Sequence, residues 1–299
     1  MSKESITVSQ KVVYKLIGYL FKIMPFQFFI SLGKLTGYIL YYLLKQRRRT
    51  GLSNLHIAFP EKSDKELLDI LKKSFQNISK DLIEILKYYV TPAEVFKKRI
   101  TIIGKENLDQ SIISGKGVVM LSAHFGNFPV LCGRLAIEGY QVAIIFREIH
   151  NNFFRPFMSI IQKKRGLIPI KDKPRYRCVA MSIKCLKKRG LLFLQIDQNP
   201  SKNAGIITNF FGHKIPTFRG PVSLAMRTGA DIIPIFIMRK PNDHHQIIIK
   251  KPYKMKLTGD KKKDIRDNLQ VLSKTTEDHI RQNPSYWWWI HRRFRKAID

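Results

Sequence analysis

The sequence predicts an α/β fold: a mixed, mostly parallel sheet flanked by helices, with a membrane-associated helical segment at the N-terminus. Short apolar runs of strand length alternate with longer segments of helical periodicity, which is the pattern of a sheet covered by helices. Hydrophobic residues make up 44% of the 299, enough for a sizeable core and too many for a disordered chain. The first 45 residues are rich in Leu, Ile, Phe and Tyr.

Residues 11–45 are expected to form two helices separated by Pro25. Polar and amphipathic side chains recur every three or four positions, which places them on one side of each helix. The stretch 24–44 approaches the roughly 20 residues that span a bilayer. Lys34 at its midpoint would cost about 2.5–3.5 kcal/mol there. Two interfacial helices therefore compete with one tilted span, and a buried helical hairpin is a third alternative.

A basic cluster, Arg47 to Arg49, follows this segment. Such a cluster beside an apolar helix marks the cytoplasmic side of a membrane and attracts anionic headgroups. The N-terminus has no small-residue cleavage site of a removable signal peptide. We therefore expect a membrane-anchoring segment over 1–49, made of amphipathic or transmembrane helices, and a single domain without repeats or linkers over 50–299.

The elements of that domain follow from local patterns. Ser63 and Glu66 have the spacing of a capping box and open a long amphipathic helix. The strands are short apolar runs bounded by polar or glycine residues. In chain order we expect a helix over 63–89, a strand over 118–121, a helix from about 129, a strand over 141–146, helices over 153–164 and 176–188, a strand over 190–196, a helix from about 219, a strand over 231–238, an edge strand over 245–249 and a helix over 263–282.

The charge balance limits the classes of partner. The chain has 54 Lys and Arg against 22 Asp and Glu, a formal net charge of +32, which favours nucleic acid, anionic lipid or an acidic carrier protein. No zinc-finger spacing, recognition helix or RNA-binding aromatic motif is present, so we expect no nucleic-acid partner. The three cysteines show no metal-ligand spacing, so no metal is expected and a reducing compartment fits best.

One histidine stands where α/β proteins bind ligands. The apolar run 118–121 ends on small residues, and His124 follows it in a loop that also holds Gly126 and Asn127. Ligands of such folds bind at the carboxyl ends of strands, and an imidazole titrates near neutral pH, as a general base must. A lone histidine more often has only a packing role, so this interpretation depends on the other motifs.

Three further motifs support a site here. Asp197 and Gln198 follow the third apolar strand, which places a carboxylate at a strand end near the histidine. The segment 209–221 is expected to be a loop with exposed aromatics that leads into a helix, whose N-terminus, with Thr217 and Arg219, suits phosphate. The three tryptophans at 287–289 precede a basic cluster, a combination typical of a membrane interface or an anionic headgroup. Each motif also has a purely structural alternative. Asp197 could cap a helix, the two phenylalanines of the loop could belong to the core, and the tryptophans could pack against the last helix.

These blocks resemble the lipid A biosynthesis late acyltransferases, the lauroyl and myristoyl transferase group of the lysophospholipid acyltransferase superfamily. The resemblance runs along most of the chain and is carried by many blocks in order. They are Arg47-Arg48-Arg49 to Asn54-Leu55, Ala58-Phe59-Pro60, Ser122-Ala123-His124-Phe125-Gly126-Asn127-Phe128, Phe146-Arg147, Asp197-Gln198, Phe210-Phe211-Gly212, Thr217, Gly220-Pro221, Thr228-Gly229-Ala230 and Trp287-Trp288-Trp289-Ile290-His291-Arg292-Arg293.

The resemblance implies an acyltransferase domain over 50–299, on the cytoplasmic face of the inner membrane. It implies transfer of a fatty acyl group from an acyl-carrier-protein or CoA thioester to a hydroxyl of a lipid A precursor or related glycolipid. His124 would be the general base and Asp197 its carboxylate. Expected partners are acyl carrier protein, an anionic glycolipid and the membrane, with no bound cofactor. The expected substrate-binding residues are Arg147, Asn127, Gln198, Lys164, Arg165, Thr217, Arg219, Arg292 and Arg293.

The sequence departs from the family pattern at one position. Late acyltransferases carry Asp or Glu after the histidine and four intervening residues, at the position where this chain has Pro129. A proline side chain accepts no hydrogen bond, so the usual dyad cannot form. Asp197, or less directly the amide of Asn127, would then have to orient the imidazole. A catalytically impaired lipid-binding relative is the alternative, and so is an acyltransferase for another phospholipid or an aminolipid.

Overall fold

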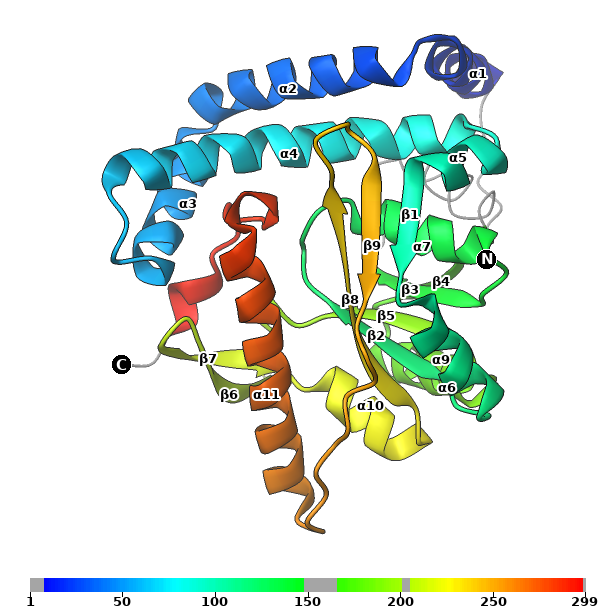
Figure 1. Ribbon diagram of the computed structural model, residues 1–299, viewed down its shortest axis with the longest axis vertical. Helices are drawn as coiled ribbons and strands as arrows, with labels where there is room; N and C mark the ends of the chain where they lie inside the picture. The colour runs from blue at the N-terminus through cyan, green and yellow to red at the C-terminus, as the bar shows by residue number, and fades with distance from the viewer. Residues whose placement is uncertain (1–7, 148–165, 201–204, 298–299) are drawn as a thin grey trace.

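A seven-stranded sheet forms the centre of the protein (Figure 1). The structure is a computed structural model, and it describes residues 8–147, 166–200 and 205–297. The strand order is β1-β9-β8-β2-β5-β3-β4, and every pairing is parallel except β8 with β9. The predicted mixed, mostly parallel sheet is therefore confirmed. The strands are β1 (Ile100–Ile103), β2 (Val118–Ser122), β3 (Val142–Phe146), β4 (Ile168–Lys171), β5 (Leu191–Gln195), β8 (Asp231–Arg239) and β9 (His245–Ile249).

Helices cover both faces of this sheet (Figure 1). Alternate β2 residues face opposite cores: Met120 packs with α4 and α7, whereas Val119 packs with α10 and α11. This alternation is the period of two that a strand imposes. The first face is covered by α4 (Asp64–Val90), α5 (Ala93–Arg99), α6 (Lys105–Ile113) and α7 (Phe128–Ile137), and the second by α9 (Arg175–Lys187), α10 (Gly220–Thr228) and α11 (Lys261–Gln282).

Most expected elements are present within one to three residues of their predicted bounds. Helix α4 begins after Ser63, whose hydroxyl accepts from the Glu66 amide while the Glu66 carboxylate accepts from the Ser63 amide, so the capping box is confirmed. The helix expected over 153–164 lies outside the described residues.

Two expectations about the β structure are wrong. The strand 245–249 does not lie at an edge, because β1 pairs with its other side. Most of the expected loop 209–221 is instead an antiparallel hairpin of β6 (Gly205–Phe210) and β7 (His213–Phe218). Phe210 and Phe211 are buried in it, not exposed, which is the structural alternative considered for them.

The N-terminal segment forms α1 (Val8–Ile23) and α2 (Phe26–Leu43). Among the described residues, no single helix is both long and apolar enough to cross a membrane. Taken together, α1 and α2 reach that length and composition, but the chain bends by 109° between them. Helix α2 lies along the outside of α4 (Figure 1). The expected boundary at residue 49 falls inside the next helix, α3 (Lys45–Ala58).

Two glycines allow α2 to approach α4 closely. A Cβ atom on Gly33 would lie 2.6 Å from Cα of Lys80, and one on Gly37 would lie 2.5 Å from Cα of Gln76. Both distances are too short for any side chain against rigid backbone, so this helix pair requires glycine here. The opposite side of α2 is exposed and mostly apolar, with Phe28, Leu32, Leu35, Ile39, Tyr42 and Leu43 among its residues.

Candidate active site

His124 and Asp197 meet at the carboxyl edge of the sheet. Strands β2 and β5 are parallel neighbours, with Ser122 opposite Gln195. His124 and Asp197 each lie two residues beyond that pair, so the register places them side by side. Nδ1 of His124 is 3.0 Å from Oδ1 of Asp197. The sequence motif therefore leads to a geometry that can orient an imidazole.

Asp197 is held in its ionised form. The side chain is buried, and its Oδ2 accepts from the His124 amide at 3.0 Å and from Nε1 of Trp287 at 2.8 Å. Burial by itself would raise the pKa of Asp197, but the nearby His124 and these hydrogen bonds outweigh it and lower the pKa to about 2. A carboxylate accepts and does not donate, so Nδ1 of His124 carries a proton, and in the neutral ring Nε2 has the lone pair.

Pro129 lies in the first turn of α7 and lines the wall of the cavity next to His124. The carboxylate that orients the imidazole comes instead from the end of β5. Asn127, the other group considered for this role, is fully buried and turned away: its Nδ2 donates to the backbone oxygen of Asp81 at 3.1 Å. Asp197 is thus the carboxylate in contact with the ring.

Aromatic rings flank the imidazole on its other sides. The rings of Trp288 and Phe128 lie 5.6 Å and 5.5 Å from the His124 ring, measured between centroids. The Trp288 amide also donates to the His124 carbonyl at 3.1 Å. Trp287 and Trp289 are buried in the core, so for these two the structural alternative holds, and their expected place at a membrane interface is wrong. The contact of Trp287 with Asp197 carried no sequence signal, because 90 positions separate the two residues.

A cavity of about 1410 Å³ opens beside His124 and extends over the end of the sheet. It reaches both faces: Ile144 and Phe193 line it on the face covered by α4 and α7, and Ile145 and Leu194 line it on the face covered by α9, α10 and α11. His124 lies at the strand ends, where both faces are accessible. The cavity therefore has two halves.

The two halves differ chemically. The half on the α4–α7 face has a nearly uncharged lining, formed by Ile85, Tyr89, Phe128, Cys132, Ile144, Leu167 and Phe193. The half on the α9–α10–α11 face has an apolar floor and a rim of cations, formed by Arg147, Lys173, Arg175, Arg219, Arg227 and Lys261. An apolar chamber suits hydrocarbon, whereas clustered Arg and Lys attract an anion.

Three of the expected substrate-binding residues line this cavity, namely Arg147, Gln198 and Arg219. Arg147 is exposed and lies 3.7 Å from the Asp172 carboxylate. Arg292 is exposed but does not line the cavity, and its carbonyl accepts from Asn199. Lys164 and Arg165 lie outside the described residues.

Thr217 and Arg293 are fully buried and contact each other, with Nη2 of Arg293 2.8 Å from Oγ1 of Thr217. Nη1 of Arg293 donates to the Pro216 carbonyl at 2.8 Å, and the guanidinium lies over the ring of Phe210. Burial lowers the pKa of Arg293 to about 10. This arginine joins the C-terminal segment to the β6–β7 hairpin and is not open to a substrate.

A second buried charged cluster ties α4 to the sheet. Arg239 at the end of β8 donates to Glu84 at 2.9 Å and to Asp81 at 2.7 Å, and Nε2 of His245 lies 3.1 Å from Glu84. Asp81, Glu84 and His245 have the spacing of a metal site, but the guanidinium of Arg239 already takes up the carboxylate oxygens. The cluster is therefore an ion-pair network that fixes α4 against β8 and β9.

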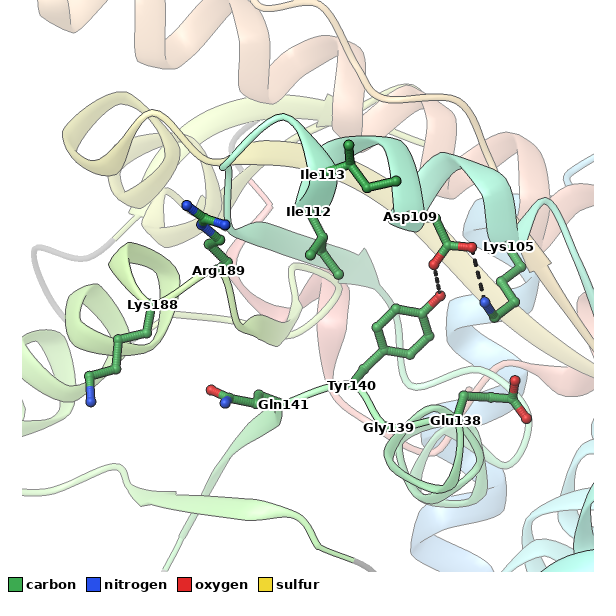
Figure 2. Close-up of a pocket in the computed structure, with 10 residues that line it drawn as sticks. All are labelled: Lys105, Asp109, Ile112, Ile113, Glu138, Gly139, Tyr140, Gln141, Lys188 and Arg189. Carbon is green, nitrogen blue, oxygen red and sulfur yellow. Dashed lines mark hydrogen bonds and ion pairs between the residues drawn. The ribbon is translucent and has the colours of Figure 1, made fainter.

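A smaller cavity of about 490 Å³ lies at the opposite edge of the sheet, near the starts of β3 and β5 (Figure 2). Tyr140 and Lys105 both bind the Asp109 carboxylate in it, with Lys105 2.9 Å away. Lys188 and Arg189 lie on its other side (Figure 2). Because the residues around it precede the strands, this cavity is remote from His124.

Comparison with known proteins places the chain in a family. The model of the bacterial lipid A biosynthesis acyltransferase family matches residues 4–296. The lipid A biosynthesis lauroyltransferase of Escherichia coli (strain K12) is 22% identical over 273 residues, which cover 91% of this chain and 87% of that protein. The lipid A biosynthesis palmitoleoyltransferase of the same organism is 22% identical over 276 residues, covering 91% and 86%.

Among solved structures, a 1-acyl-sn-glycerophosphate acyltransferase from Thermotoga maritima aligns with a TM-score of 0.38 and 13% identity, over 83% of this chain and 96% of that chain. That likeness is too low to support an argument about this protein. The family match extends over nearly the whole chain, including the segments that hold His124 and Asp197. The protein is therefore an acyltransferase and belongs to the bacterial lipid A biosynthesis acyltransferase family.

Proposed function

We propose that this enzyme transfers a fatty acyl group from the thioester of an acyl carrier protein to a hydroxyl group of a lipid A precursor. His124 acts as the general base, and the reaction takes place at the cytoplasmic face of the inner membrane. The observation that carries the proposal is the 3.0 Å contact between His124 and Asp197 beside a cavity with an apolar chamber, in a chain of this family.

The proton path follows from the orientation of the ring. Asp197 accepts the Nδ1 proton of His124, so Nε2 takes the proton from the acceptor hydroxyl as its oxygen attacks the thioester carbonyl. The tetrahedral intermediate then expels the thiolate, which receives the proton from Nε2. The products are an ester and a free carrier thiol. A positioned base of this kind contributes about 10²–10⁴-fold to the rate.

The developing oxyanion needs a donor other than the first amides after the histidine. The backbone N–H groups of residues 125–127, directly after the histidine, and a nearby cation are the candidate donors. However, the Phe125 amide donates to Ala123 at 2.8 Å, and the Gly126 amide donates to Tyr286 at 3.0 Å. These two amides are already satisfied, which leaves the Asn127 amide and a cation at the cavity as the donors.

The membrane surface would be met by α1 and α2. The exposed side of α2 presents Phe28, Leu32, Leu35 and Ile39, and α1 presents Leu16 and Leu20. Such a surface suits helices that lie in the headgroup region of a bilayer. The acyl chain of the donor would then occupy the apolar half of the cavity under α4 and α7.

The alternative is a lipid-binding relative without activity, suggested by Pro129. The contact of Asp197 with the imidazole favours the enzyme, because the lost carboxylate has a substitute. The test is release of free carrier thiol by the purified protein with acyl carrier protein thioester and a lipid acceptor. We expect release that depends on the acceptor and is lost in His124→Ala, with vesicle binding retained. Acceptor binding without thiol release would support the lipid-binding alternative, and wild-type activity in His124→Ala would exclude the base.

A further inference from the structure

The cationic half of the cavity holds more positive charge than the acyl-transfer step itself requires. It is lined by Lys173 and Arg175 at the start of α9, Arg219 and Arg227 at the two ends of α10, and Lys261 at the start of α11. All five are exposed, and none forms an ion pair within the part of the chain that the structure describes. As far as the described residues go, their positive charge is therefore available to a ligand.

The two carboxylates that line this half, Asp172 and Asp264, are too few to balance its six cations. Asp264 is buried and already accepts from the Thr258 amide at 2.8 Å and from its hydroxyl at 2.7 Å. Asp172 lies beside Arg147. Unpaired Arg and Lys side chains at the mouth of an apolar cleft bind phosphate groups well, because the low-dielectric wall weakens solvent screening.

The order of chemical features along the cavity matches one type of substrate. From the cationic rim the cavity passes the strand ends near His124 and continues to the uncharged chamber under α4 and α7. An acyl group on a phosphopantetheine arm has the same order, with a phosphodiester at one end, the thioester between, and hydrocarbon at the other end. The acceptor lipid has its phosphates in the headgroup layer.

The position of the cations relative to α2 separates these two sources of phosphate. Helix α2 lies outside α4 on one side of the sheet, whereas α9, α10 and the start of α11 lie on the other (Figure 1). If α1 and α2 rest on the bilayer, the cationic rim faces the aqueous side. A carrier protein in solution reaches that side, and a headgroup in the bilayer does not.

We propose that Lys173, Arg175, Arg219, Arg227 and Lys261 form the entry site for the donor and bind the phosphodiester of its phosphopantetheine arm. This inference rests on the proposed function. It assigns the two substrates to opposite faces of the sheet, with the donor entering from the α9–α10–α11 face and the acceptor from the α2 side.

The test compares two soluble donors that differ only in the phosphate, acyl-phosphopantetheine and acyl-pantetheine. We expect the wild-type enzyme to prefer the phosphorylated donor at least tenfold in kcat/KM. In the double variant Arg227→Gln, Lys261→Gln, that ratio should fall to about one, while KM for the lipid acceptor changes less than twofold. The matched control is Lys188→Gln, Arg189→Gln, which removes the same two charges at the opposite edge of the sheet (Figure 2) and should keep the preference.

Four results overturn the inference in different ways. An unchanged donor ratio in the double variant would show that these cations do not bind the arm. A raised KM for the acceptor instead would assign them to the lipid phosphates, with acyl transfer itself intact. Loss of the preference in the control as well would point to a general effect of net charge. If the wild-type enzyme transfers no acyl group from any thioester, the proposed function fails first, and this inference fails with it.

Discussion

Trp287 holds the carboxylate of Asp197 in place, with its indole N–H 2.8 Å from Oδ2. The tryptophan belongs to the C-terminal segment, and the aspartate lies two residues after the end of β5. The same oxygen accepts the His124 amide at 3.0 Å, so Oδ1 faces the imidazole while Oδ2 is fixed by two donors. This arrangement explains how a carboxylate that follows a different strand can take the part that Pro129 cannot.

Replacing Trp287 by Phe should lower kcat with little change in KM. The substitution keeps an aromatic ring in the core and removes one charge-assisted hydrogen bond, which is worth about 1.5–3 kcal/mol. If that bond stabilises the transition state, its loss lowers the rate roughly tenfold or more. The matched control is Trp289→Phe, whose indole donates to the Pro284 carbonyl instead. Equal losses of kcat in both variants would mean that only packing is involved.

The acid stability of the enzyme should depend on Asp197. Its pKa is lowered from an ordinary value near 3.8 to about 2 in the folded protein, so the unfolded chain binds its proton first as the pH falls. The carboxylate therefore stabilises the fold above about pH 4, and this stabilisation, on the order of 2 kcal/mol, is lost between about pH 4 and pH 2.

Urea unfolding of the wild type and Asp197→Asn at pH 6, 4 and 3 measures this contribution. The free energy of unfolding should fall more steeply with acid in the wild type, because the amide has no proton to gain. Glu84, whose pKa is also lowered to about 2, contributes equally to both proteins. Parallel pH curves for the two proteins would be inconsistent with a carboxylate stabilised in this way.

The sequence was sufficient for the parts of the site that depend on strand ends. His124 and Asp197 follow apolar runs whose parallel pairing brings them together, and local patterning predicts such runs. The four-residue strands β1 and β4 could not be predicted from the sequence. The alternation of buried and exposed positions in β1, for example, covers too few residues to be recognised as a strand pattern. Such strands are specified by the neighbours they pair with.

The misassigned residues share a different cause. Thr217, Arg293 and Trp287 are polar or amphipathic side chains that the fold buries and satisfies with partners far away in sequence. Trp289 is buried against Phe59, which is equally remote in sequence. Residue type alone indicates exposure for Arg and an interface for Trp. Only the packing of the C-terminal segment against the β6–β7 hairpin and α4 decides otherwise, and no local pattern records that contact.

A side chain at Gly33 should separate α2 from α4. The substitution Gly33→Ala would place Cβ 2.6 Å from the Lys80 Cα, and backbone cannot move aside without shifting the whole helix. We expect a loss of about 1–3 kcal/mol in the free energy of unfolding, as for other overpacked positions. Gly18→Ala in α1 is the control, because its Cβ would meet nothing within 4 Å; helix propensity alone would then make it neutral or stabilising. A stable Gly33→Ala protein would show that the helices do not pack this closely.

The exposed side of α2 should determine membrane binding. Leu35→Glu places a charge in the middle of the apolar face, and it should reduce binding to vesicles that contain anionic lipid by about tenfold or more, because a buried leucine is worth roughly 1.5–3 kcal/mol. Leu257→Glu is the control, since Leu257 is equally exposed but lies between β9 and α11. Sedimentation with vesicles measures both variants. Similar losses in both would indicate that net charge, and not this face of α2, governs binding.

The length of the transferred acyl chain should depend on Cys132. This side chain is buried in α7 and lines the uncharged half of the cavity, so Cys132→Phe would shorten the space for hydrocarbon. We expect the preferred donor to become shorter by two or more carbons, at about 0.8 kcal/mol per methylene excluded. The control is Cys178→Phe, which adds the same ring to the cationic half and should leave the chain-length preference in place. Competition among donors of different chain lengths measures both variants, and a shift in Cys178→Phe alone would assign the acyl chain to the other half.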